Sequence, residues 1–124
     1  MNQATGRTVL VVEDQDEVRT LVMRTLADEG YRVLTACDGI EALEVLEADP
    51  EVSLVVSDLV MPRMDGFELA NHLSKRVPSP LMLFMSGYGD HHTEIQHPYL
   101  QKPFAPATLC REVQRLLLPA QNQA

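Results

Sequence analysis

The sequence lacks the long apolar segments that membrane and secreted proteins carry. No run approaches the roughly 18 apolar residues of a membrane-spanning helix, and residues 1–7 contain no apolar stretch like that of a secretory signal. Only two cysteines occur, Cys37 and Cys110, and they are far apart without metal-type spacing. We therefore predict free thiols in a reducing compartment, and a cytoplasmic domain that makes no membrane contact.

Positive charge is also scarce in this chain. The sequence has 10 Lys and Arg against 18 Asp and Glu, which gives a formal net charge of -8. Such a chain has no basic stripe to neutralise a phosphate backbone, so direct nucleic-acid binding is not expected. With 124 residues there is room for one compact domain. We expect it to span residues 8–118, between a flexible leader (1–7) and a flexible tail (119–124).

Apolar runs typical of strands alternate with segments of helical periodicity. This alternation predicts strand-helix-strand units around a parallel sheet, which is an α/β fold. The continuous runs at 9–12 and 54–56 are typical of strands covered on both faces, so they belong at the sheet centre. The short run at 99–100 suits an edge. Five strands are predicted in all, at residues 9–12, 31–36, 54–56, 81–85 and 99–100.

Local signals mark the ends of the predicted helices. Apolar residues recur at helical spacing from 18 to 26, and Gly30 ends that helix. Acidic residues at 38 and 41, and again at 65 and 68, have the spacing of a capping box. Pro106 begins a last helix. Gly and Pro residues interrupt the periodicity between 86 and 102, so the fourth helix of the fold should be short or missing.

Polar side chains gather where the predicted strands end. Glu13, Asp14, Asp58, Ser86 and Lys102 all follow the carboxyl ends of strands, which is where open α/β sheets bind ligands. Three carboxylates placed together raise one another's pKa unless a cation lies between them. Mg²⁺ prefers oxygen ligands and needs only one or two carboxylates. The sequence therefore predicts a magnesium site at this edge.

Four segments in this order resemble the receiver family of two-component signalling: 9–14 (VLVVED), 58–66 (DLVMPRMDG), 85–88 (MSGY) and 102–104 (KPF). The resemblance implies a flavodoxin-like, doubly wound, five-stranded parallel sheet of order 2-1-3-4-5. It also implies a domain of a two-component or phosphorelay system that takes phosphate from a histidine kinase or a histidine phosphotransfer protein. Many transcriptional regulators of the family dimerise through the fourth helix and fifth strand, so the short or missing fourth helix leads us to expect a monomer. Such a domain promotes its own phosphorylation and is not otherwise an enzyme.

The resemblance assigns the site residues one by one. Asp58 is the phospho-acceptor, and Asp14 and Asp58 bind Mg²⁺ with the backbone carbonyl of Val60, while Glu13 holds a metal-bound water. Lys102 pairs with a phosphoryl oxygen. The switch residues are Ser86, which hydrogen-bonds another phosphoryl oxygen, and Tyr99, which swings inward. The expected partner-docking surface lies beside the acceptor and comprises Gln15, Val18 and Arg19.

Several alternatives stay open at this level. Segments 85–88 and 100–104 look like receivers at the carboxyl end of hybrid sensor histidine kinases, but a stand-alone regulator has the same length. Arg63 and Tyr88 flank the pocket mouth, where they either tune phosphoryl lifetime or form a solvated rim. Residues 14–16 (DQD) also resemble the Asp-x-Asp motif of haloacid-dehalogenase-like phosphatases, in which Asp14 would be the nucleophile. That interpretation leaves the 58–66 motif unexplained.

Overall fold

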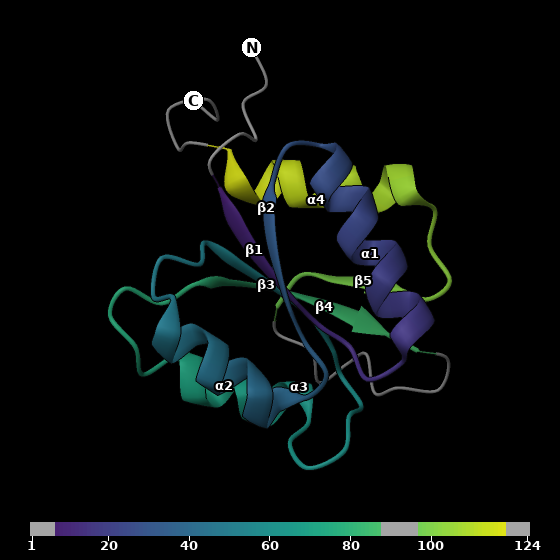
Figure 1. Cartoon of the computed structure of the whole chain (residues 1–124). Coiled ribbons are helices and arrows are strands. Elements are labelled where there is room, and N and C mark those ends of the chain that lie inside the picture. Colours follow the sequence, from purple (N-terminus) through teal and green to yellow (C-terminus); the bar gives the residue numbers. More distant parts are fainter. Residues whose placement is uncertain (1–6, 88–96, 119–124) are drawn as a thin grey trace.

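The structure, a computed structural model, describes residues 7–87 and 97–118 (Figure 1). Its core is a five-stranded sheet with the order β2-β1-β3-β4-β5, and every neighbouring pair is parallel. The predicted fold is therefore confirmed. The elements in chain order are β1 (Thr8–Val12), α1 (Asp16–Asp28), β2 (Arg32–Ala36), α2 (Gly39–Ala48), β3 (Leu54–Asp58), α3 (Gly66–Leu73), β4 (Leu81–Ser86), β5 (Tyr99–Gln101) and α4 (Pro106–Leu117).

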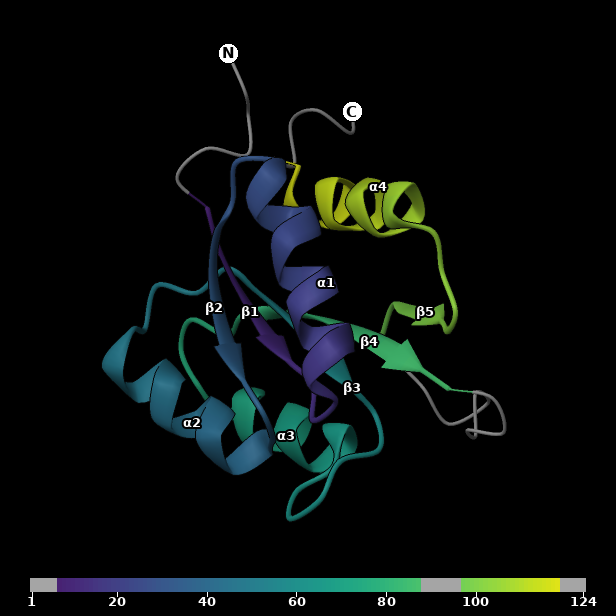
Figure 2. The same ribbon diagram turned by 45° about the vertical axis from the view of Figure 1, so that its right-hand side comes forward.

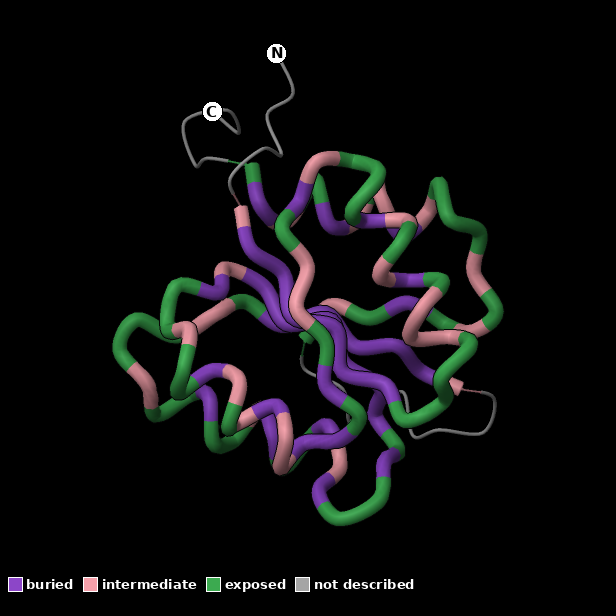
Figure 3. Tube along the Cα trace, viewed as in Figure 1, coloured by how far each residue is buried: buried purple, intermediate pink, exposed green. Residues whose placement is uncertain are grey.

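Helices cover both faces of the sheet, with α1 and α4 on one face and α2 and α3 on the other (Figures 1 and 2). Successive residues of a strand point to opposite faces, so β1 supplies both cores. Val9 and Val11 pack with Leu109 of α4, whereas Leu10 packs with Leu46 of α2. Figure 3 shows the resulting buried centre. Each such side chain contributes about 1.5–3 kcal/mol when it leaves water.

The predicted helix signals are confirmed in the structure, with one difference. Gly30 has a φ of 100° just after α1, and Asp65 and Glu68 form a complete capping box at α3. The Asp38 side chain accepts from the Glu41 N–H at 2.8 Å and caps α2. The Glu41 carboxylate does not complete a capping box with the Asp38 N–H, however, because it accepts from the Cys37 N–H at 2.6 Å.

Other sequence predictions have mixed outcomes. The short strand β5 lies at the sheet edge as expected, and both cysteines are free. Among the described residues, none of the helices has the length and apolar character needed to cross a membrane. The expected short or missing fourth helix concerns mainly residues 88–96, which lie outside the described part of the chain, as do residues 1–6 of the leader and the tail.

Candidate functional site

The parallel register brings the predicted polar residues to one edge of the sheet. Asp58 is the last residue of β3 and lies opposite Met85 of β4, so Ser86 is one position further along. Ser86 in turn lies opposite Gln101, the residue before Lys102. Glu13 directly follows β1, which is the other neighbour of β3. The juxtaposition expected from the strand ends is therefore present.

Three carboxylates form an acidic pocket at this edge. Glu13, Asp14 and Asp58 each offer an oxygen atom, and these atoms all lie within 4.8 Å of one another. Glu13 and Asp58 are buried, whereas Asp14 is exposed. A donor set made only of carboxylate oxygens fits a hard cation such as Mg²⁺ better than a softer metal. The geometry is thus consistent with a metal site.

Lys102 provides the positive charge of the pocket. Its Nζ lies 2.9 Å from Glu13 Oε1 and 3.2 Å from Asp58 Oδ2. The lysine is three-quarters buried, since its side chain is 23% exposed. Because an ion pair in a poorly solvated site is only weakly screened, this ammonium is the main counter-charge that the chain itself supplies to the two buried carboxylates.

Burial governs the electrostatics of these groups. Loss of water raises the pKa of Asp58 and of Glu13, although Lys102 opposes the rise in both. Burial would lower the pKa of Lys102, but its hydrogen bond to Glu13 and the charge of Asp58 outweigh that effect and raise it. A further cation in the pocket would favour the ionised carboxylates, which are the forms that can bind metal or attack phosphorus.

Two hydrogen bonds hold Glu13, one from the segment between β1 and α1 and one from α1 itself. Glu13 Oε2 accepts the Gln15 N–H at 3.1 Å, and the Glu13 carbonyl accepts from Arg19 Nη1 at 2.9 Å. Arg19 also pairs with Asp16 at 2.6 Å. Of the predicted docking residues, Gln15 is exposed, whereas Val18 and Arg19 are half-buried. Part of the Arg19 guanidinium is therefore engaged within the chain.

The two predicted switch residues differ in exposure. Ser86 is fully buried, and its carbonyl accepts the Lys102 N–H at 2.7 Å. Ser86 Oγ lies 3.5 Å from the Gly87 carbonyl oxygen, to which it donates a long hydrogen bond. Tyr99 at the start of β5 is 41% exposed. Ser86 is thus buried at the end of β4, opposite the residue that precedes Lys102, whereas Tyr99 is in contact with solvent.

The loop from β3 to α3 requires glycine at its end. The Gly66 N–H donates to the Leu59 carbonyl at 2.8 Å, and a Cβ on Gly66 would lie only 2.7 Å from the Asp58 carbonyl oxygen. No larger residue fits there without moving the backbone of Asp58. Val60 lies in this loop with its side chain 66% exposed. The loop shape and the placement of Asp58 are therefore linked.

Sequence reasoning missed the partner of Arg63. Arg63 donates from Nε at 2.9 Å and from Nη2 at 2.6 Å to Asp38 Oδ2. Arg63 is therefore ion-paired within the chain, although its side chain stays 59% exposed. No local pattern marks a pair 25 positions apart, so only the folded chain reveals it. Tyr88, its suggested companion, lies outside the described residues.

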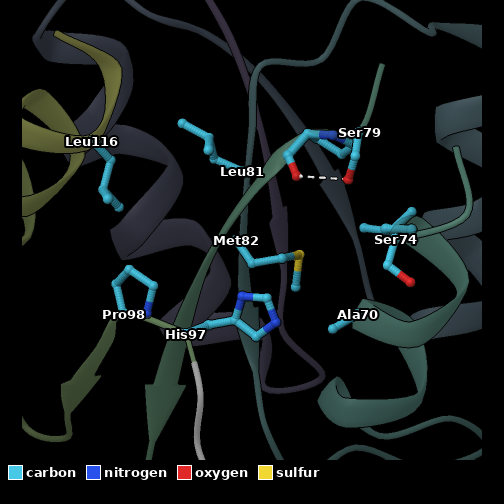
Figure 4. A pocket seen from close by; sticks show the side chains of 10 residues that line it. Ala70, Ser74, Ser79, Leu81, Met82, His97, Pro98 and Leu116 are labelled. Atoms are coloured by element: carbon cyan, nitrogen blue, oxygen red, sulfur yellow. Dashed lines mark hydrogen bonds between the residues drawn. The ribbon is translucent and has the colours of Figure 1, made fainter. Parts of the chain in front are cut away.

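A hollow of ≈ 170 Å³ lies beside the first residues of β4 (Figure 4), whereas the acidic pocket lies at the carboxyl ends of the strands. Among the described residues, none that lines it is a carboxylate. Its walls come from α3, the segment before β4, β4 itself, the segment before β5 and α4. The lining residues are Ala70, Leu73, Ser74, Ser79, Pro80, Leu81, Met82, His97, Pro98 and Leu116.

Comparison with known proteins agrees with this geometry. The model of the response regulator receiver domain family matches residues 9–114. The sensor kinase CckA of Brucella abortus is 41% identical over 117 residues, which are 89% of this chain but only 12% of the kinase. The receiver protein CpdR of the same organism is 31% identical over 90% of this chain and 98% of its own length.

A solved structure gives the same result. The crystal structure of the receiver domain from the hybrid histidine kinase CckA superposes with a TM-score of 0.78 at 33% identity, covering 90% of this chain and 99% of that one. The family match and the superposed structure identify a receiver domain rather than a classical enzyme. The chain belongs to the response regulator receiver domain family. This membership leaves the phosphatase alternative without support.

Proposed function

We propose that this chain accepts a phosphoryl group from a phosphohistidine onto Asp58. The observation that carries the proposal is the Lys102 ammonium, 3.2 Å from Asp58 Oδ2 at the end of the central strand β3. A carboxylate oxygen of Asp58 attacks phosphorus in line, so an O–P bond forms as the N–P bond breaks and the imidazole leaves. Lys102 and Ser86 stabilise the charge on the transferred group.

The proposed cofactor is Mg²⁺. Asp14, Asp58 and the Val60 carbonyl are the proposed ligands, and Glu13 holds a water on the ion. Support comes from the three carboxylate oxygens that lie within 4.8 Å of one another. When bound, Mg²⁺ would offset the negative charge of the phosphoryl oxygens. The buried carboxylates Glu13 and Asp58 would then share the cationic charge of Lys102 with the incoming group.

We propose that phosphorylation of Asp58 changes the surface around β5, the strand that pairs with β4. Once a phosphoryl group is on Asp58, the Ser86 hydroxyl turns toward it and Tyr99 moves inward behind Ser86. The exposed ring of Tyr99 and the buried position of Ser86 match the state before phosphorylation. A charge change at one atom is thereby converted into a change of surface.

The proposed donor is a histidine kinase or a histidine phosphotransfer protein, which docks over Gln15, Val18 and Arg19. We place the chain, with residues 8–118 as a monomeric domain, in the cytoplasm, where ATP supplies histidine kinases. The 41% identity to the sensor kinase CckA favours the receiver of a hybrid kinase. CpdR, matched over 98% of its length, keeps a stand-alone regulator as the alternative. The sequence of the complete gene decides between them.

Intact-mass measurement tests the acceptor directly. The protein is incubated with Mg²⁺ and a small acyl phosphate, and compared with Asp58→Asn, Asp14→Asn and the control Asp16→Asn, which alters a carboxylate paired with Arg19 on the surface. We expect one phosphoryl adduct in the wild type and in the control, none in Asp58→Asn and little in Asp14→Asn. An adduct that survives Asp58→Asn but needs Asp14 would refute the assignment.

A further inference from the structure

Arg63 adopts a backbone conformation that its residue type disfavours. It lies in the loop between β3 and α3 with a φ of 71°, the only positive φ at a non-glycine among the described residues. The left-handed region brings the Cβ of an L-residue too close to the following carbonyl oxygen, and glycine avoids this cost because it has no Cβ. Arginine at this position therefore needs a compensating interaction.

The compensating interaction is an ion pair with Asp38. Both Arg63 donors reach one oxygen of Asp38, Oδ2, at 2.9 and 2.6 Å. The other oxygen, Oδ1, accepts the Glu41 N–H and caps α2. The Asp38 side chain is 7% exposed, so the carboxylate is buried although the arginine is open to solvent. Charge-assisted bonds of this length to a buried acceptor are strong ones.

A second contact joins the loop between β3 and α3 to the start of α2. A Cβ on Gly39 would lie 2.8 Å from Met64 Cγ, so the Met64 side chain packs directly on the first residue of α2. The far end of the loop is closed by the Gly66 N–H bond to Leu59. The stretch between Asp58 and Gly66, which includes Val60, is thus fixed at its ends and against α2.

We propose that Arg63 and Asp38 are positioning residues that hold the Asp58–Gly66 loop in its Mg²⁺-binding arrangement. This inference rests on the proposed function, because it assumes that Mg²⁺ binds beside Asp58. Neither residue is among the proposed ligands of the ion. If the pair is broken, the loop occupies several arrangements. The apparent affinity for Mg²⁺ then falls in proportion to the fraction of molecules whose loop is still in the Mg²⁺-binding arrangement.

Calorimetric titration of the full chain with Mg²⁺ alone tests the pair. We expect Arg63→Gly to weaken Mg²⁺ binding about threefold to tenfold, although it removes the backbone strain, and Arg63→Lys to restore part of the affinity. Asp38→Asn keeps an oxygen to cap α2 but loses the charge, and it should weaken binding to a similar extent. The double variant should lose no more than either single one.

The control variant is Arg32→Ala, which breaks the surface pair between Arg32 and Asp49 at 2.6 Å. It should leave Mg²⁺ affinity unchanged. Amide exchange without Mg²⁺ should quicken at Val60 and Met64 in Arg63→Gly and in Asp38→Asn, but not in Arg32→Ala. If the Arg63 and Asp38 variants lower thermal stability but bind Mg²⁺ as the wild type does, the pair is merely structural and the inference is wrong. A wild type that binds no Mg²⁺ would instead overturn the metal site on which it rests.

Discussion

Lys102 donates a hydrogen bond of 2.9 Å to the fully buried carboxylate of Glu13, which precedes it by 89 positions in the chain. Its distance to Asp58 is longer, at 3.2 Å. The ammonium is therefore shared between a structural partner and the proposed acceptor. When Asp58 gains a phosphoryl group, the balance of charge around Lys102 changes, and the pair with Glu13 fixes the position from which the lysine responds.

Lys102→Met should separate catalysis from metal binding. Loss of the ammonium removes a charge that stabilises the transferred group, so the phosphorylation rate should fall about 10²- to 10³-fold. Mg²⁺ should bind more tightly, since a competing cation has left the two carboxylates. Stopped-flow phosphorylation and calorimetry measure the two effects. An unchanged transfer rate would remove Lys102 from the mechanism, and Lys75→Met, a substitution outside the pocket, serves as the control.

Two glycine variants should differ in stability. In Gly66→Ala the new Cβ meets the backbone oxygen of Asp58 at 2.7 Å, so the backbone must move. In Gly39→Ala it meets side-chain atoms of Met64, with Cγ at 2.8 Å and Cβ at 2.9 Å. Rotation of the side chain moves Cγ away, but the Cβ is relieved only by a small shift between the loop and α2. We expect Gly66→Ala to lower the free energy of unfolding by about 1–3 kcal/mol and Gly39→Ala by less. Urea unfolding followed by circular dichroism gives both values, and equal losses would contradict the distinction.

The stability difference between wild type and Asp38→Asn should depend on pH. The Glu41 N–H, and after it Arg63, hold the pKa of Asp38 below its ordinary value of 3.8. A depressed folded-state pKa stabilises the protein above the unfolded value, and this contribution is lost as pH falls through the folded value. Unfolding midpoints should therefore differ most at neutral pH and converge below 3.8. A constant difference would mean that the Asp38 charge contributes nothing.

Phosphorylation should bury residue 99. The chain has no tryptophan, so Tyr99→Trp introduces a unique fluorophore at an exposed site. We expect its emission to shift to shorter wavelength when an acyl phosphate and Mg²⁺ are added, because the ring leaves water. Adding Ser86→Ala should abolish the shift without preventing the mass increase on Asp58. A shift that persists in Ser86→Ala would show that the serine does not couple the two sites.

The elements could be predicted from the sequence because their signals are local. The apolar run of β1, the glycine after α1 and the box at Asp65 and Glu68 each lie within a few residues. The proximity of Asp58 and Lys102 could also be predicted from the sequence, because the carboxyl ends of parallel strands meet at one edge of the sheet. The side-chain ion pairs could not be predicted from the sequence. Which oxygen Lys102 contacts, and that Arg63 meets Asp38, depend on side-chain packing between distant segments, which periodicity does not encode.

The position of β3 has a consequence for how such a domain diversifies. All five of its residues are buried, and it is paired on both sides, with β1 and β4. Strands enclosed in this way are among the last parts of a protein to open. The proposed acceptor Asp58 therefore sits on a rigid strand, and we expect substitutions in the surrounding loops to alter ion affinity or partner choice without moving it. New signalling specificities can arise around the same chemistry without any change to the strand that bears it.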